Sequence, residues 1–382
     1  MALSLHATQA RRTFLAAMVG GTLLLAGCQT APMGPPPGPR PGPGPVGPVQ
    51  VPQNGVAIIV PMTGGDAAVG QSIANAAKLA LADTGEKSLK LTVYDSAAVG
   101  GAAGAATRAI ADGNGLILGP LLGEDVRAAA PIARQAGVPI ISFSNDRDVA
   151  GNGVFIMGFT PDQSIGRVVS YAKTRGVSRY AVLAPTGVYG QRATQSMLAA
   201  VRRSGGSMGA VETYNRSAAS VGAAAKRLNS KGNFDAILIA DSGRIAAIVA
   251  PSLSVGPRIL GTELWATDKT LGKTTALRGG WYAAATDVQF DKMSVRYRSR
   301  FGRTPFRLAS LGYDAVLLAV RSARDWDIGR PFPARKLVAS DGFGGVDGSF
   351  RFGRDGIADR LLEVRQVTAT GSEVIDPARS AF

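Results

Sequence analysis

The side chains that most often carry enzyme chemistry are nearly missing from this chain. Its 382 residues include one histidine and one cysteine, His6 and Cys28, and both lie within the first 28 residues. If that segment is processed on export, the remaining chain has neither an imidazole nor a cysteine available as a free thiol. This excludes a Ser-His-Asp triad, a cysteine nucleophile, a His/Cys metal site and a disulfide framework.

Carboxylates are the reactive groups that remain, and Asp241, Glu263 and Asp287 are the candidates near the ends of apolar runs. A paired-carboxylate hydrolase needs two of them about 5–9.5 Å apart across a cleft, and nothing in the sequence pairs them. The glycines at 64 and 65 are not followed by the Gly-Lys-Ser/Thr of a phosphate loop. We therefore predict a binding protein with no catalytic residue, no metal and no cofactor.

The first 28 residues have the pattern of an export signal. Two arginines at 11 and 12 precede an apolar run over residues 14–26, which is too short to span a bilayer comfortably. The run ends in Leu-Ala-Gly-Cys, which resembles a bacterial lipobox with Cys28 as the lipidated residue. The arginine pair also resembles a twin-arginine signal, so the export route stays open. Gln29, rather than aspartate, favours the outer membrane over the inner membrane.

Residues 29–54 are predicted to be a tether. Ten prolines and five glycines lie between residues 31 and 54, and such a segment favours polyproline II conformations and buries no core. The globular body, expected over residues 55–382, would then stand away from a membrane.

The charge of the chain is strongly basic. Forty-two basic and 27 acidic residues give a net charge of +15, and removal of Arg11 and Arg12 with the signal leaves +13. A basic surface favours anionic partners such as peptidoglycan or lipid head groups. No dense basic run is interleaved with aromatic residues, so nucleic acid is not an expected partner. The cluster of Arg296, Arg298, Arg300 and Arg303 is predicted to be a solvated face.

From residue 55 onward, apolar strands alternate with helices. This pattern predicts an α/β fold with two doubly wound parallel-sheet lobes joined by a hinge. Strands are expected at 56–60, 89–95, 116–118, 138–142, 180–185, 210–214, 236–240, 258–262 and 281–285. We expect the first lobe to comprise about 55–160 and 286–340, and the second about 161–285 and 341–382.

The order of several short motifs resembles the type I periplasmic-binding-protein fold, in its leucine/isoleucine/valine-binding branch. These motifs are Gly-Pro-Leu-Leu at 119–122, Ala-Pro-Ile-Ala at 130–133, Gly-Val-Pro-Ile-Ile-Ser at 137–142, Val-Tyr-Gly at 188–190 and Gly-Tyr-Asp-Ala at 312–315. The resemblance implies three crossovers that form a hinge and a ligand in the cleft between the lobes, which agrees with ligand binding at the carboxyl ends of strands.

The resemblance also implies which residues line that cleft: Thr63, Leu122, Gly123, Ser144, Asn145, Tyr189, Asp241 and Glu263. Tyr189 matches the tyrosine of the family's Tyr-Gly element, and Glu263 matches the acid that pairs with the ammonium of an amino acid. The serine that donates to a ligand carboxylate is replaced by Gly123. Asp146 would repel such a carboxylate unless a cation intervenes, so the amino-acid site is half retained.

Two functions follow from the resemblance. The chain is similar to penicillin-binding protein activators, lipoproteins that stimulate a peptidoglycan synthase, in its Gly-Pro-Leu-Leu element and its expected anchor, although it lacks their helical-repeat domain. We therefore expect a non-enzymatic scaffold or activator of a peptidoglycan synthase, lipid-anchored at the periplasmic face. The alternative is the amino-acid-binding component of an ABC importer, whose partner would be an ABC permease.

Overall fold

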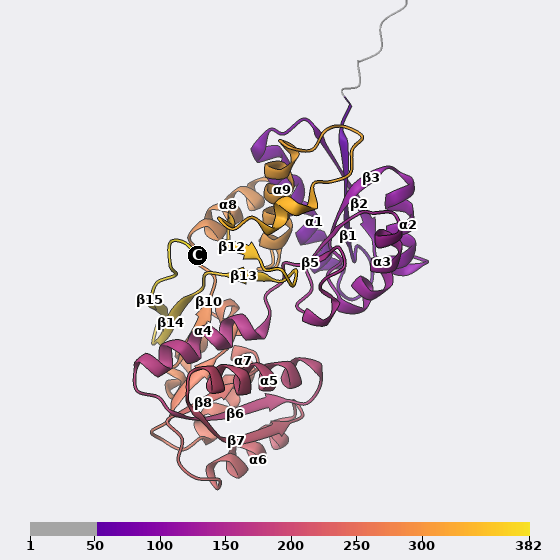
Figure 1. Ribbon diagram of the computed structural model, residues 1–382. Coiled ribbons are helices and arrows are strands. Elements are labelled where there is room, and N and C mark those ends of the chain that lie inside the picture. The colour runs from indigo at the N-terminus through magenta and orange to yellow at the C-terminus, as the bar shows by residue number, and fades with distance from the viewer. Residues whose placement is uncertain (1–51) are drawn as a thin grey trace, which may run out of the picture. The chain divides into compact units, whose positions relative to one another are not determined.

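The computed structural model describes residues 52–382 (Figure 1). Residues 51–382 form one compact unit with its own hydrophobic cores, so this body is expected to fold without the preceding segment. The expected signal peptide, Cys28 and most of the expected tether lie outside the described residues. Within residues 52–382, no helix is both long enough and apolar enough to cross a membrane.

The first lobe is built on a five-stranded sheet in which all strands are parallel. Its order is β2-β1-β3-β4-β5, with bounds β1 Asn54–Val60, β2 Leu89–Asp95, β3 Asn114–Leu118, β4 Ile140–Ser142 and β5 Val154–Ile156. The central strands are apolar throughout because helices cover both faces, as expected for a parallel sheet.

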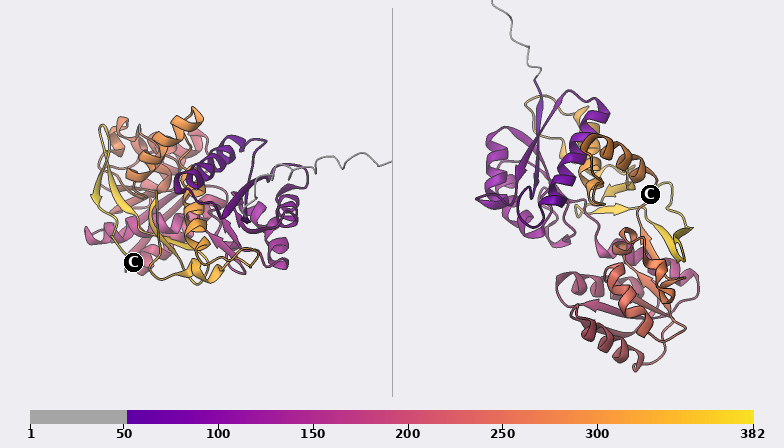
Figure 2. Two further views of the ribbon diagram at one scale, coloured as in Figure 1. Left: turned by 90° about the horizontal axis from the view of Figure 1, so that it is seen from above. Right: turned by 180° about the vertical axis from the view of Figure 1, so that it is seen from behind.

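Alternate residues of β1 enter the two cores of this lobe. Val56, Ile58 and Val60 join the core formed with α1 (Ala67–Thr84), α8 (Val288–Phe301) and α9 (Ala309–Ala323). Ala57 and Ile59 join the core formed with α2 (Gly101–Ala111) and α3 (Gly123–Gln135). The period of two is that of a strand buried on both sides, and Figure 2 shows these helix groups on opposite sides of the sheet.

The second lobe contains a seven-stranded mixed sheet of order β15-β14-β10-β9-β8-β6-β7. The strands are β6 Arg179–Pro185, β7 Ser207–Tyr214, β8 Ala236–Ile239, β9 Arg258–Gly261, β10 Trp281–Ala284, β14 Glu363–Thr368 and β15 Gly371–Asp376. Strands β14 and β15 are antiparallel to their neighbours, and the others run parallel. One face carries α4 (Pro161–Thr174) and α5 (Val188–Arg203), and the other carries α6 (Ala218–Asn229) and α7 (Gly243–Val249).

A small third sheet corrects the expected lobe boundary. Strands β11 (Phe343–Gly345), β12 (Gly348–Phe352) and β13 (Ala358–Arg360) pair antiparallel. Phe343, Phe350 and Phe352 pack in the core of the first lobe, whereas the sequence analysis placed all of residues 341–382 in the second. Phe352 packs edge-on against Phe155 of β5, and β11 contacts α9. The chain therefore crosses to the second lobe only at β14.

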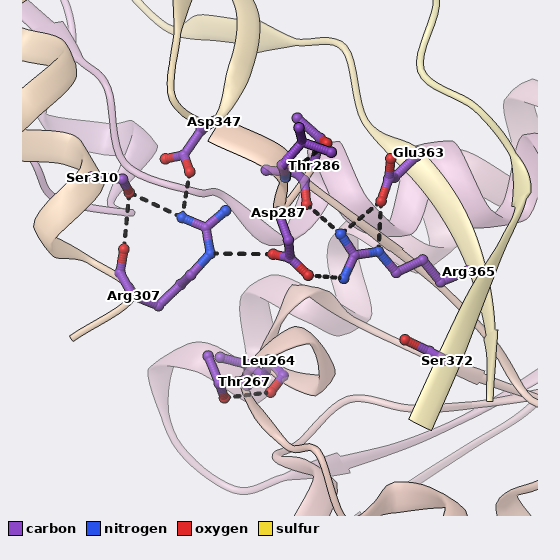
Figure 3. A network of polar contacts seen from close by, with 12 residues as sticks. Leu264, Thr267, Thr286, Asp287, Arg307, Ser310, Asp347, Glu363, Arg365 and Ser372 are labelled. Atoms are coloured by element: carbon purple, nitrogen blue, oxygen red, sulfur yellow. Dashed lines mark hydrogen bonds and ion pairs between the residues drawn. The ribbon is translucent and has the colours of Figure 1, made fainter. Parts of the chain in front are cut away.

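The chain passes between the lobes at three places: from β5 to α4, from β10 to α8, and from β13 to β14. Ion pairs join two of these crossovers (Figure 3). Arg365 on β14 binds Asp287, which precedes α8, and also Glu363. Arg307 lies 3.9 Å from the same Asp287 and also pairs with the buried Asp347. The hinge region is therefore held by a connected set of charges.

The elements that the sequence analysis did not predict are β5, α8 and β15. Helix α8 holds three of the four clustered arginines, which were expected to be a solvated face. All four are exposed, and Arg296 in addition pairs with Asp83 on α1 at 3.0 Å and donates to the hydroxyl of Tyr313 on α9. Part of this cluster therefore joins helices of the first lobe.

Candidate ligand-binding site

A cavity of ≈ 990 Å³ lies between elements of the two lobes. From the first lobe it is lined by residues after β3 and β4, by α8 and by the segment 304–308; from the second it is lined by the segment after β9. Four phenylalanines supply aromatic walls: Phe143, Phe159, Phe290 and Phe306. This size and lining are typical of sites for small organic molecules.

Glu263 is the one acidic group of the cavity wall, within residues 52–382, that is not exposed to solvent and forms no ion pair; Asp66 and Asp291 also line the cavity but are exposed. It begins the short helix after β9 and lines the cavity. Its Oε1 accepts a hydrogen bond of 3.0 Å from the hydroxyl of Tyr189, and its Oε2 accepts one from Ser164. Burial raises the pKa of Glu263 above its ordinary value, although the two hydroxyl groups oppose this effect.

Tyr189, the second residue of α5, connects Glu263 to Thr262 as well. Burial and the neighbouring Glu263 carboxylate raise the pKa of Tyr189 well above its usual value, so its phenol keeps its proton at neutral pH. The arrangement presents one carboxylate, oriented by two hydroxyl donors, to a cavity with aromatic walls. It is suited to accept hydrogen bonds from an ammonium group.

Between the two lobes, next in the chain to the cavity-lining Asn145, Asp146 forms two ion pairs. Its Oδ2 lies 2.6 Å from Nη2 of Arg127 on α3, and its Oδ1 lies 2.6 Å from Nη2 of Arg192 on α5. Burial opposes ionisation of this carboxyl, but the N–H of Asp148 and the two guanidinium groups outweigh it and hold its pKa below the ordinary value. The sequence predicted that a cation would be needed beside Asp146, and the structure has two, Arg127 and Arg192.

The predicted site residues fall into three groups. Leu122, Asn145 and Glu263 line the cavity, and Tyr189 holds Glu263. Gly123 and Ser144 contact Asp146. The carboxylate of Asp146 fills the space beside Gly123, and the hydroxyl of Ser144 accepts a hydrogen bond of 3.1 Å from the backbone N–H of Asp146.

Thr63 and Asp241 have other partners and are not among the residues that line the cavity. The exposed Thr63 donates to Asp95 at 2.7 Å. Asp241 is buried in an ion pair of 2.9 Å with Arg216 and also accepts from Tyr214. Both residues hold loops at the carboxyl ends of strands, within a single lobe.

Three kinds of residue at the site were not predicted from the sequence. Ser164 and Glu263 are 99 residues apart along the chain, and nothing local links them. Arg192 follows Tyr189 by three positions on one helix, so the two side chains share a face; this spacing could have indicated Arg192. The aromatic residues of α8 were missed with the helix itself.

The carboxylates considered for hydrolysis have different partners. Asp241 pairs with Arg216, Asp287 pairs with Arg365, and Glu263 is held by hydroxyl groups. Glu263 and Asp287 line the same cavity, and Asp241 does not.

One protein family matches most of the described body. The model of the family described as "Periplasmic binding protein" matches residues 55–372. The chain belongs to the periplasmic binding protein family. The leucine-binding-protein-like fold expected from the sequence is thereby confirmed, as are its α/β class and parallel-sheet lobes.

Solved structures share the fold of this periplasmic binding protein. The leucine-binding protein LivK from Thermotoga maritima MSB8 is 22% identical, with 85% of this chain and 99% of that chain covered and a TM-score of 0.64. A solute-binding protein from Rhodopseudomonas palustris BisB5, in complex with 3,4-dihydroxybenzoic acid, is 21% identical over 86% of this chain and 97% of its own, with a TM-score of 0.66.

A curated relative is similar over a shorter range. The uncharacterized protein RP748 from Rickettsia prowazekii (strain Madrid E) is 25% identical over 178 residues, which is 47% of this chain and 48% of the relative. The chain thus spans about half the length of that relative. The likeness to the solved structures, at their low identities, establishes the fold alone.

Proposed function

We propose that this periplasmic binding protein is a receptor for a small, largely apolar solute that carries an ammonium group. The observation that carries the proposal is the position of Glu263: a carboxylate with no basic partner among residues 52–382, oriented by Tyr189 and Ser164, at the wall of an aromatic cavity. A ligand ammonium would supply the missing countercharge, and the phenylalanine rings would cover the apolar part and add cation–π attraction.

The ligands of similar proteins support this size. A substrate-binding protein from Desulfitobacterium hafniense was solved with leucine, and one from R. palustris was solved with benzoate. We propose that the ligand here is of the same size, and that the receptor delivers it to an ABC permease. Lipidation at Cys28 would hold the receptor at the periplasmic face of the envelope, with residues 29–54 as the tether.

Thermal unfolding of the cysteine-free body, residues 51–382, tests the proposal. The panel contains isopentylamine, phenethylamine, leucine, isoleucine and benzoate. A ligand at 100 times its dissociation constant stabilises the folded state by about 2.7 kcal/mol. We expect this shift with at least one of the two amines. Glu263→Gln should abolish it, whereas Glu373→Gln, which alters an exposed glutamate on β15, should leave it unchanged.

Absence of any shift with the panel at millimolar concentrations would contradict the proposal. So would an amine shift that Glu263→Gln leaves intact, because the amine would then bind elsewhere.

The scaffold or activator function is a second candidate, and the Asp146 ion pairs favour it. They join α3 of one lobe to α5 of the other through the protein's own side chains, and a fixed relation between lobes suits a surface that docks on a partner. Pull-down of purified peptidoglycan synthases with the body tests this candidate. Retention of a synthase that is lost with Asp146→Ala would support it, and no retention would contradict it.

A further inference from the structure

We infer that Asp146 is a built-in anion that selects the ligand: it neutralises the arginines at its end of the cleft, so that the site takes amines that carry no carboxylate. This inference rests on the proposed function and narrows its ligand class from amino compounds in general to amines without an acid group.

The carboxylate of Asp146 has all its contacts supplied by the protein. The residue is 3% exposed. One oxygen pairs with Arg127, and the other pairs with Arg192 and accepts a hydrogen bond of 3.1 Å from the N–H of Asp148. A buried carboxylate with two charge-assisted contacts is bound as a ligand anion would be bound. Asp146 therefore occupies an anion site made by the chain itself.

The two arginines come from different lobes. Arg127 lies on α3 of the first lobe and Arg192 on α5 of the second. Arg192 follows Tyr189 on the same helix, and Tyr189 holds Glu263. The groups that would recognise an anion and the group that would recognise a cation therefore meet at one cleft. The charges of Arg127 and Arg192 are already neutralised by Asp146.

The absence of a side chain at Gly123 leaves the space that the Asp146 carboxylate occupies. A Cβ at position 123 would lie 2.7 Å from Oδ2 and 2.9 Å from Cβ of Asp146. No side chain therefore fits at 123 while Asp146 stays between its arginines. A hydroxyl group on residue 123, which could donate to a ligand carboxylate, is excluded by the same contact.

The remaining charges at the cavity complete the selection. Asp66, Glu263, Asp287 and Asp291 line it together with Lys269, Arg298 and Arg307. Arg307 and Asp287 belong to the hinge network, and Lys269 and Arg298 are exposed, where water and salt screen their charge. Within residues 52–382, a ligand carboxylate beside the Glu263-bound ammonium would thus meet no desolvated cation that lacks an acidic partner in the protein, because the largely buried Arg307 pairs with Asp287 and Asp347.

Pairs of ligands that differ by one carboxylate test this inference. Isopentylamine is leucine without its carboxylate, and phenethylamine is phenylalanine without it. Calorimetric titration of the wild-type body should give an affinity at least about tenfold higher for the amine than for the amino acid of each pair. In Asp146→Ala the arginines are free, and the affinity for the amino acid should rise by about tenfold or more.

Two further variants keep the test decisive. Asp146→Asn keeps the size of the side chain and its contact with Asp148 and removes only the charge, so it replaces the alanine variant if that one fails to fold. Asp162→Ala breaks another ion pair between the lobes, with Arg147, at residues that do not line the cavity. It should leave the preference for amines unchanged.

The possible results separate the two proposals. Equal affinity of the wild type for amine and amino acid, or no gain of amino-acid binding in both Asp146 variants, overturns the inference while the receptor function stands. If no ligand binds the wild type, the receptor function fails. Stabilisation of Asp146→Ala, but not of the wild type, by 50 mM acetate would then still support a built-in anion, and its absence would overturn it.

Discussion

Asp146 and Arg192 form a 2.6 Å ion pair between the two lobes, and the same carboxylate reaches Arg127 at 2.6 Å on its other side. One acidic side chain therefore contacts a helix of each lobe. The position depends on the absence of a side chain at residue 123, because that is where the carboxylate lies. The stability of the body should accordingly depend on the pair of residues 123 and 146 together.

Gly123→Ala should destabilise the body by about 1–3 kcal/mol, since the new methyl group displaces Asp146 from its arginines. The measurement is the free energy of unfolding in urea. In Asp146→Ala the space is free, so adding Gly123→Ala there should cost much less. Gly222→Ala on α6, where nothing lies within 4 Å of the new Cβ, should be neutral or stabilising by up to about 1 kcal/mol. Additive effects of the two substitutions would contradict the contact.

Amine binding should strengthen with rising pH across the titration of Glu263. Burial raises the pKa of this carboxyl above its ordinary value, and only the ionised form attracts an ammonium. The affinity should therefore increase by up to about tenfold per pH unit below that pKa and level off above it. Titrations with phenethylamine from pH 4.5 to 8 test this, and an affinity that stays flat or falls over this range would contradict it.

Tyr189→Phe should weaken amine binding at pH 7 by about 3- to 10-fold, because Glu263 loses one of its two hydroxyl donors. The Tyr189 hydrogen bond also lowers the pKa of Glu263, so the pH profile of binding should move to higher pH. Tyr171→Phe on α4 is the matched control, since its hydroxyl contacts Arg175. An unchanged profile in Tyr189→Phe would show that the tyrosine does not orient Glu263.

A buried carboxyl in the first lobe should make stability depend on pH. Asp314 is 1% exposed and accepts from the N–H of Val346 at 2.7 Å. Burial and the neighbouring Asp347 carboxylate raise the pKa of Asp314 to about 7. Because the folded state holds this proton more tightly than the unfolded state, the contribution is fully present below about pH 4. It is lost as the pH rises to about 7.

The comparison of Asp314→Asn with the wild type isolates this contribution. The fall in unfolding free energy from pH 5 to pH 8 should be smaller in the variant by on the order of 2 kcal/mol. Asp325→Asn, at an exposed ion pair with Lys336, should keep the wild-type dependence. Identical slopes in wild type and Asp314→Asn would contradict the raised pKa.

The sequence was sufficient for the order of the main elements because continuous apolar strands and amphipathic helices are local patterns. It was insufficient for β5, which has three residues, and for α8, whose buried side chains are few: Met293, Ser294 and Tyr297. The strands β11–β13 were assigned to the wrong lobe because their pattern shows only that they are strands. The core into which Phe350 packs is set by tertiary structure.

For the site, the sequence indicated Glu263 and Tyr189 through the resemblance, and it indicated that Asp146 would need a cation. It could not supply Ser164, which reaches Glu263 from α4, 99 residues away along the chain; Arg192 could have been found from its spacing to Tyr189 on α5. For Thr63 and Asp241, the sequence predicted cleft residues that the structure does not place at the cavity. Each follows a strand as a cleft residue would, but each pairs with a nearby side chain of its own lobe.

A crystal structure of the body grown with phenethylamine tests the central claim most directly. The account predicts the ligand in the cavity between the lobes, with its nitrogen within about 3.2 Å of a Glu263 carboxylate oxygen and its ring against the phenylalanine walls, while Asp146 keeps both arginines. An amine bound away from Glu263, or a cavity that stays without ligand at saturating concentration, would contradict it.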